Sequence, residues 1–213
     1  MPTRRAGLRE EKKQATREAL RAAALRLALE RGPDNVRVDD IAEAAGVSTR
    51  TYNNYFSSRE QAIVAAVTAE RESRIAAVVA AATDVRLTDA VVGAIVAQYT
   101  NPAEHDRAAL LLITTRPTLR DAFVDTATAI ERPLTTAIAG RLGDTDERTA
   151  RVLAACVAAT VRVALEQWVQ PTAGAGGLVV AAGSLPDLLR RTLAPLRPAL
   201  DAAEDQRHQR PQR

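Results

Sequence analysis

The segment from Val38 to Phe56 constrains the fold most, because it encodes two short helices joined by a tight turn. Gly46 permits the positive φ that such a turn often needs, and Ser48 is placed to cap the helix that follows. The apolar residues of the first helix lie on one side: Val38, Ile41, Ala42 and Ala45. Because Ala42 and Ala45 are small, the second helix can approach closely. The pattern predicts a helix-turn-helix.

The second helix of this segment is polar on its outward face. Tyr52 and Phe56, four residues apart, are expected to point into the core, which leaves Thr49, Arg50, Asn53 and Asn54 outside. Arginine pairs bidentately with guanine, asparagine pairs with adenine, and the threonine methyl contacts the thymine methyl. These residues favour a recognition helix for the DNA major groove. The alternative is an ordinary helical corner with a solvated polar face.

Composition extends the helical prediction to the whole chain. Among 213 residues there are 44 alanines and only 3% aromatic residues, a balance that favours helix and excludes an all-β fold. The single cysteine, Cys156, excludes a disulfide framework, and its apolar helical surroundings predict an inert core thiol. The first 60 residues carry 12 basic and 9 acidic side chains, which equals the net charge of +3 of the whole chain. A basic end on a neutral body is typical of a module that faces a polyanion.

The order of apolar periodicity and breakers predicts nine or ten helices. A basic flexible arm is expected at residues 1–9, and Ser58 is expected to cap one long helix that ends near Ala82. Pro133 should kink its helix, residues 171–177 read as a flexible connector, and residues 201–213 as a disordered tail. The predicted helices span residues 10–31, 38–45, 49–55, 58–82, 88–100, 103–115, 118–141, 146–169 and 186–196.

Residues 14–64 resemble the TetR family of bacterial transcriptional regulators. The likeness is carried by Leu29-Glu30-Arg31-Gly32, by Ile41-Ala42 with Ala45-Gly46-Val47-Ser48, and by Thr51 with Tyr55-Phe56 and Ser58-Arg59-Glu60. It implies a homodimer that binds a double-stranded DNA operator, with a helix-turn-helix domain at 10–57 and a helical ligand-binding and dimerisation domain at 58–200. It places these residues at or near DNA: Ser48, Thr49, Arg50, Thr51, Asn53, Asn54, Tyr55 and, at a phosphate, Arg59.

Three departures from the family pattern bear on the operator. Arg50 and Asn53 stand where many members have Gly and Tyr, so the base preference is expected to shift. Arg37 stands where a capping Thr is frequent; an arginine cannot cap in that way, but it can meet a phosphate.

The C-terminal body predicts a site for a small lipophilic effector. An alanine-rich bundle with few rings leaves apolar space, and the stretch 108–120 is similar to a subgroup that binds acyl-CoA-like lipids. The candidate lining residues, each of which could instead pack or lie on the surface, are Tyr99, Thr114, Thr115, Arg116, Phe123, Arg162, Gln167 and Trp168, with Arg116 or Arg162 as partners for acyl-CoA phosphates. His105 is expected at the surface. An effector is expected to tilt the long Ser58-capped helix as a lever and so release the DNA.

The helix at 146–169, together with 186–196, is the expected dimer surface, with a small-residue face at Val152, Ala155, Ala159, Arg162 and Val163. No catalytic motif, resident cofactor or metal-ligand set is recognised, so an enzyme is not expected. The sequence contains no run of 18 or more apolar residues, so no membrane span is predicted. This favours a cytoplasmic protein. The alternative function is a helical ligand sensor that acts through protein partners without sequence-specific DNA binding.

Overall fold

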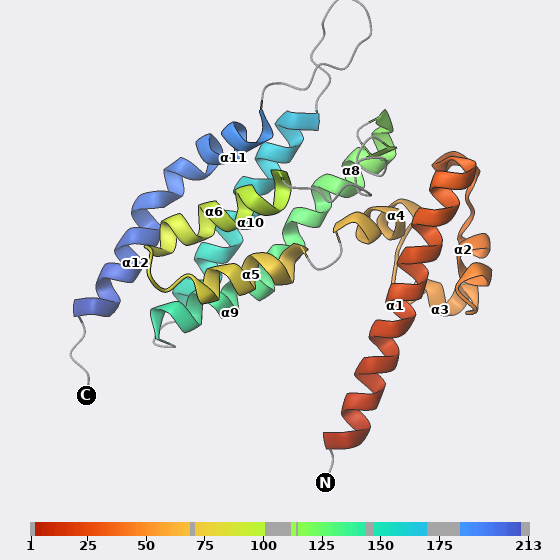
Figure 1. Ribbon diagram of the computed structural model, residues 1–213, viewed down its shortest axis with the longest axis horizontal. Helices are drawn as coiled ribbons and strands as arrows, with labels where there is room; N and C mark the ends of the chain where they lie inside the picture. The colour runs from red at the N-terminus through yellow and green to blue at the C-terminus, as the bar shows by residue number, and fades with distance from the viewer. Residues whose placement is uncertain are drawn as a thin grey trace, which may run out of the picture. The chain divides into compact units, whose positions relative to one another are not determined.

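The computed structural model describes residues 3–68, 71–100, 112–113, 115–143, 147–169 and 184–209. Every regular element in these ranges is helical, which confirms the all-α prediction (Figure 1). The chain forms two compact units. Unit 1 comprises Met1–Ala69 with Glu104–Phe123, and unit 2 comprises Glu70–Ala103 with Val124–Arg213.

Unit 1 is built around the helix-turn-helix. Its first helix packs against two later ones, and the core between them holds Leu20, Leu27, Ile41, Ile63 and Val67. These apolar side chains recur every three or four residues along each helix, so each helix buries one face. The elements in chain order are α1 (Thr3–Arg31), the 3-10 turn η1 (Pro33–Asn35), α2 (Val38–Ala44), α3 (Thr49–Asn53) and α4 (Arg59–Thr68).

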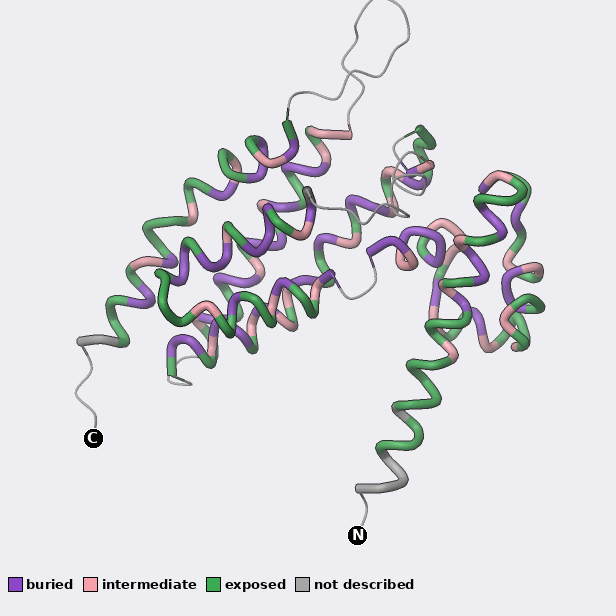
Figure 2. Tube along the Cα trace, in the orientation of Figure 1, coloured by how far each residue is buried: buried purple, intermediate pink, exposed green. Residues whose placement is uncertain are grey.

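The N-terminal helix begins earlier than the sequence predicted. α1 starts at Thr3, so residues 3–9 are helical rather than a flexible arm. Arginine, glutamate, lysine and glutamine dominate the first turns, and these residues lose little side-chain freedom in a helix. Figure 2 shows that this first part of α1 is exposed, and burial begins at Leu20.

The long helix predicted from 58 to 82 is described as two helices. α4 belongs to unit 1, where Ala62, Ile63 and Val64 are buried. α5 (Arg71–Ala81) belongs to unit 2 and buries Ile75 and Val79. The first unit therefore extends past the predicted boundary at residue 57, and the segment predicted as one long helix contributes to both units.

Unit 2 is a helical bundle in which α5, α6, α9, α10, α11 and α12 pack on one another. The irregularity expected near Pro133 appears as the 3-10 segment η2, which separates α8 from α9. α8 contributes residues to both units. The remaining elements are α6 (Leu87–Thr100), α8 (Pro117–Asp125), η2 (Thr126–Ile130), α9 (Glu131–Leu142), α10 (Glu147–Val169), α11 (Leu185–Leu193), η3 (Ala194–Leu196) and α12 (Arg197–Gln209).

The tail predicted to be disordered at 201–213 is helical as far as Gln209. Three acids of α12 hold it against the start of α6: Glu204 accepts the Leu87 amide at 3.0 Å, Asp201 accepts the Thr88 hydroxyl at 2.7 Å, and Asp205 pairs with Arg86 at 3.0 Å. Acids at a helix N-terminus also complement its dipole. Polar contacts with a distant segment therefore order a sequence that lacks an apolar pattern.

Several predictions fall outside the described residues. They are the connector at 171–177, the surface position of His105, most of the helix at 103–115, and Thr114.

One helix, α10, is long and apolar enough to cross a membrane by length and composition alone, although charged residues interrupt its apolar run. α10 has 23 residues, and an 18-residue window of it reaches a mean hydropathy of 1.5. Its apolar side chains are spread over two faces: one is buried against α9 and α11, and the other, with Val152 and Val163, is exposed.

Candidate functional site

The turn between α2 and α3 has the geometry that its glycine predicted. Gly46 has φ of 70°, in the left-handed region, and a Cβ there would meet no atom within 4 Å. The backbone conformation, not lack of space, is therefore what favours glycine. The Val47 amide donates to the Ala42 carbonyl at 2.9 Å and the Gly46 amide to Glu43 at 3.0 Å, so the last carbonyls of α2 are satisfied.

α3 has only five residues, and contacts at its first turn hold it. The Ser48 hydroxyl accepts the Thr51 amide at 3.1 Å and lies 2.9 Å from the Thr51 hydroxyl, which confirms the predicted cap. The Thr49 hydroxyl donates to Asp39 at 2.6 Å, so α2 and α3 are joined by a side-chain bond that the sequence pattern did not indicate.

Tyr52 anchors the inner face of α3. Its side chain is fully buried, its hydroxyl donates to the Ser58 carbonyl at 2.7 Å, and its ring lies 5.8 Å from that of Phe56. Burial, with a smaller contribution from the charge of Glu60, raises the pKa of Tyr52 to about 12. The buried ring therefore fixes the rotation of α3 about its axis, as the four-residue spacing predicted.

The opposite face of α3 is presented to solvent. Arg50, Asn53 and Asn54 are exposed, and within the described part of the chain no hydrogen bond or ion pair engages their side chains. Thr51 and Tyr55 are half-buried at the edges of this face. The arrangement leaves one guanidinium and two carboxamides available for bonds outside the protein, which is the chemistry of base-edge recognition.

The two flanking arginines differ. Arg37 is exposed, and its backbone amide donates to the Asp40 carboxylate at 2.9 Å, so the acid three residues later satisfies the N–H of the residue that precedes α2. Arg59 instead turns inward: its guanidinium donates to the carbonyls of Asp34 at 3.1 Å and Val36 at 2.9 Å, and pairs with Glu60. Arg59 thus clamps the chain ahead of α2, a role that the predicted phosphate contact did not anticipate.

Glu60 and Gln61 complete this junction. The pKa of Glu60 is lowered: its burial raises the pKa, but hydrogen bonds and the charge of Arg59 outweigh that effect. Ser58 accepts the Gln61 amide at 3.1 Å, as predicted, whereas the Gln61 carboxamide oxygen accepts the amide of Ser57 rather than that of the capping residue.

The described effector candidates are divided between the two units. Arg116 pairs with Asp34 at 2.8 Å within unit 1, where exposed Thr115 and buried Phe123 also lie. The remaining candidates belong to unit 2: Tyr99 lies under the Arg71 guanidinium at 4.4 Å, Arg162 pairs with Glu166 at 3.0 Å, Gln167 is exposed, and Trp168 is half-buried. Burial raises the pKa of Tyr99, and Arg71 opposes this.

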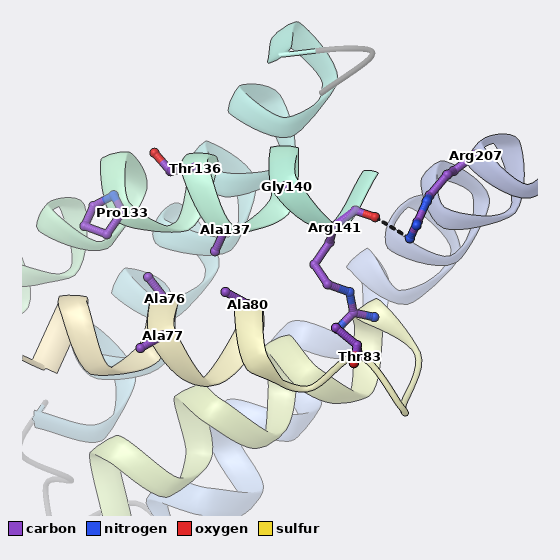
Figure 3. Close-up of a pocket in the computed structure, with 10 residues that line it drawn as sticks. All are labelled: Ala76, Ala77, Ala80, Thr83, Pro133, Thr136, Ala137, Gly140, Arg141 and Arg207. Atoms are coloured by element: carbon purple, nitrogen blue, oxygen red, sulfur yellow. Dashed lines mark hydrogen bonds between the residues drawn. The ribbon is translucent and has the colours of Figure 1, made fainter. Parts of the chain in front are cut away.

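A groove of about 550 Å³ lies elsewhere in unit 2, between α5 and α9 (Figure 3). Its walls are small residues of the two helices, among them Ala76, Ala80, Ala137 and Gly140, and Arg141 and Arg207 lie at one end. Short side chains on facing helices leave space, a signal that the sequence search for large and polar lining residues overlooked.

The Arg141 guanidinium at this end is already engaged by the protein. It donates to the carbonyls of Val79, Ala82 and Val85 and pairs with Glu204 at 2.8 Å, and both partners of that ion pair are nearly buried. Arg141 therefore joins α5, α9 and α12, and the apolar walls are the part of the groove open to a ligand.

The predicted dimer face of α10 is exposed. Val152 and Val163 are 56% and 44% exposed, Ala159 and Arg162 are exposed as well, and Ala155 is half-buried. Cys156 lies on the same face and is exposed, so the prediction of a core thiol is wrong. The residues around Cys156 in the sequence are apolar, but α10 has two apolar faces, and Cys156 lies on the exposed one.

Comparison with known proteins finds two family patterns in the chain. The model described as "Bacterial regulatory proteins, tetR family" matches residues 20–66, and the model described as "MftR C-terminal domain" matches residues 85–201. The HTH-type transcriptional regulator TcmR of Streptomyces glaucescens is 38% identical over 71 residues, which are 33% of this chain and 31% of that protein. The match thus spans about a third of that relative. The crystal structure of a TetR-family regulator from Streptomyces coelicolor A3 covers 88% of this chain and 95% of its own, with a TM-score of 0.50 and 23% identity, a likeness in fold.

Proposed function

Because the chain belongs to the TetR family of bacterial regulatory proteins, we propose that it is a repressor that binds a palindromic operator as a homodimer and is released by a small lipophilic ligand. Its family makes it a DNA-binding transcriptional regulator rather than an enzyme. Repression, the operator, the dimer and the effector are the proposed parts, and we place its action in the cytoplasm, where the DNA is.

The outward face of α3 carries the proposal for DNA. Arg50, Asn53 and Asn54 are exposed on a helix that Ser48 and Tyr52 hold in place. A rigid helix with unengaged base-reading groups is what major-groove recognition requires. Arg37 is the proposed phosphate contact beside this face, whereas Arg59 acts as a positioning residue through the carbonyls that it binds.

Selection of bound fragments from the source genome tests this assignment. The recovered sites should be palindromes whose half-sites lie about one helical turn apart or somewhat more (~34–36 Å). Arg50→Ala, Asn53→Ala and Asn54→Ala should each relax the preference at one position of each half-site and cost about 1–3 kcal/mol of binding free energy. Arg37→Ala should weaken all sequences alike. Unchanged base preference in all three α3 variants would contradict the proposed face.

Dimerisation is supported by the exposed face of α10. Val152, Ala159 and Val163 recur at helical spacing, and small or branched apolar residues suit close packing against a second copy of the same helix. Val152→Glu together with Val163→Glu should convert the protein into a monomer with greatly weakened operator binding, as sedimentation and operator titration would show. Val78→Glu together with Val85→Glu, at exposed valines outside α10 and α11, is the matched control for added charge. A double variant that remains dimeric would exclude this face.

The groove between α5 and α9 is the proposed effector site. Its apolar walls favour a lipophilic ligand, and long-chain acyl-CoA is the first candidate class, with the matching free acids as comparison. A ligand seated there would displace α5, which residues 69 and 70 join to α4. Because DNA and ligand would favour different arrangements, each should weaken the other by the same factor, typically ~5–150-fold.

Filling the groove tests this site. A Cβ on Gly140 would meet open space, so Gly140→Leu should fold normally and block the groove. Gly93→Leu is the matched control, since Gly93 is also a helical glycine in open space but does not line the groove. In a titration of the operator complex with acyl-CoAs and free acids, release should be lost in Gly140→Leu and kept in Gly93→Leu. Equal release from both variants would place the effector elsewhere.

A further inference from the structure

The first part of α1 is largely exposed, and its described contact with the rest of unit 1 is that of Arg17 with the Phe56 ring. Residues 3–19 precede Leu20, where burial of this helix begins and where the tetR family pattern also begins. Among the side chains described there, all are exposed except Thr16, which is half-buried. This extension of α1 is therefore an addition to the helix-turn-helix core and not part of its packing.

The cations of the extension continue the stripe that is apolar farther along the helix. Arg9, Lys13 and Thr16 precede Leu20, Ala24 and Leu27 at intervals of three or four residues, so all six lie on one face. Lys12 and Arg17 flank this stripe, and Arg17 lies over the Phe56 ring at 5.6 Å. Glu11 and Glu18 fall on the opposite face. The same side of α1 thus changes from an apolar surface against unit 1 to a basic surface.

These cations are not neutralised within the described part of the chain, where no ion pair involves Arg9, Lys12, Lys13 or Arg17. Residues 3–19 contain six basic and three acidic residues in all. The extension also lacks the apolar face that insertion into a membrane surface requires, since Leu8 is its only large apolar residue. The surface is therefore suited to a polyanion.

The position of the stripe within unit 1 identifies the polyanion. α1 packs against α2, which packs against α3, and Figure 1 shows α1 running past α3 with its N-terminal part continuing beyond. Seventeen helical residues span about 25 Å, the length of about seven base pairs of duplex. We propose that Arg9, Lys12, Lys13 and Arg17 form a second DNA-binding surface, which contacts backbone phosphates beside the base pairs that α3 reads. This inference rests on the proposed binding of α3 to an operator.

The extension is also suited to become more ordered on DNA. A helix that continues from a packed segment avoids the cost of nucleation, but its unpacked end frays in water. Phosphates bound along one face would favour the helical form over the frayed one. Binding should therefore slow hydrogen exchange of the amides of residues 7–19.

Removal of charge from the centre of the stripe tests the proposal in the full-length protein. Arg9→Gln with Lys13→Gln keeps good helix formers and removes two cations. If each cation meets one phosphate, the slope of log K against log salt should become shallower by about 0.9 for each contact, or about 1.8 per protomer. Base preference should not change, and hydroxyl-radical footprints should lose protection of the backbone beside the half-site. Arg9→Lys with Lys13→Arg preserves charge and should behave as the unchanged protein does.

A second control removes two cations elsewhere: Arg74→Gln with Arg132→Gln changes the net charge equally at exposed positions of α5 and α9 and should leave the salt slope nearly unchanged. The inference is overturned if the stripe variant keeps the slope, the footprint and the exchange protection of the original protein. If the stripe variant is unchanged in these three measurements and the original protein still binds its operator, the proposed function stands and only this inference fails. Absence of operator binding by the original protein would instead refute the proposed function.

Discussion

The helix-turn-helix of unit 1 and the bundle of unit 2 differ in how far along the chain the polar contacts that hold them reach. In unit 1, Ser48 caps an amide three residues away, and Tyr52 bonds a carbonyl six residues away. In unit 2, Glu204 receives the Arg141 guanidinium 63 residues away and the Leu87 amide 117 residues away. Local contacts leave a pattern in the sequence, whereas contacts between distant segments leave none. The difference explains why the helix-turn-helix of unit 1 is recognisable from a short motif, whereas the packing of unit 2 is not.

The largest effect should come from the long-range contacts of unit 2. Arg141→Met would remove the guanidinium that pairs with nearly buried Glu204 at 2.8 Å, with Arg86 remaining at 3.9 Å, and would leave the carbonyls of Val79 and Val85 without this donor. We expect a loss of about 3–5 kcal/mol in unfolding free energy, measured by urea denaturation. Arg141→Met combined with Glu204→Leu should recover part of the loss. A loss below about 1 kcal/mol in the single variant would show that the distant contact is not what holds unit 2 together.

A pH-dependent loss of stability should come next, and it belongs to unit 1. Burial raises the pKa of Tyr52 to about 12 from 10.0, so the folded state favours the neutral phenol. Its contribution is fully present below pH 10 and is lost as pH rises from 10 to 12, which amounts to about 2–3 kcal/mol. Denaturation at pH 9 and pH 11 should show about half of this loss in the original protein, because pH 11 lies midway between the two pKa values. The Tyr52→Phe variant should lose less unfolding free energy over the same pH interval. Buried Tyr99, whose pKa is also raised, is present in both proteins and contributes equally to each.

A smaller effect is expected from the local cap of α3. Ser48→Ala removes the acceptor of the Thr51 amide and should cost about 1 kcal/mol of unfolding free energy. Ser48→Asp keeps an acceptor at the same position and is the matched control. A cost equal to that of Arg141→Met would contradict the distinction between short local contacts and buried distant ones.

The smallest effect should come from the ion pair between Asp34 and Arg116. Both side chains are about half exposed, so Asp34→Asn should cost about 0.2–1 kcal/mol. The cost should vanish in 1 M salt, because exposed charges are then screened. Denaturation at low and high salt checks this result. A cost that persists at high salt would indicate that residues 104–123 are attached to unit 1 more firmly than this pair suggests.

The sequence predicted those parts of unit 1 that depend on neighbouring residues. Gly46, the Ser48 cap and the inward Tyr52 each follow from spacing within a few residues, and the structure confirms them. Arg59 was assigned to a phosphate by family resemblance, and its bonds to carbonyls 23 and 25 residues away leave no local pattern in the sequence.

Unit 2 was less predictable for the same reason. The helical tail after residue 200 depends on Glu204 reaching α6 and α9, which no periodicity reveals. The groove at Ala80 and Gly140 was missed because it is created by the absence of large side chains on helices 60 residues apart. Cys156 was assigned to the core because apolar composition does not tell which of two apolar faces of a helix is buried.

The exposed side chains of α3 also bear on how such a protein can change. Arg50, Asn53 and Asn54 contribute nothing to the described core, and substitutions at exposed sites of this kind usually alter stability by less than about 0.5 kcal/mol. The residues that hold α3 in place, Ser48 and Tyr52, are a separate set. A lineage could therefore acquire a new DNA target through substitutions that leave the scaffold intact, without passing through poorly folded intermediates.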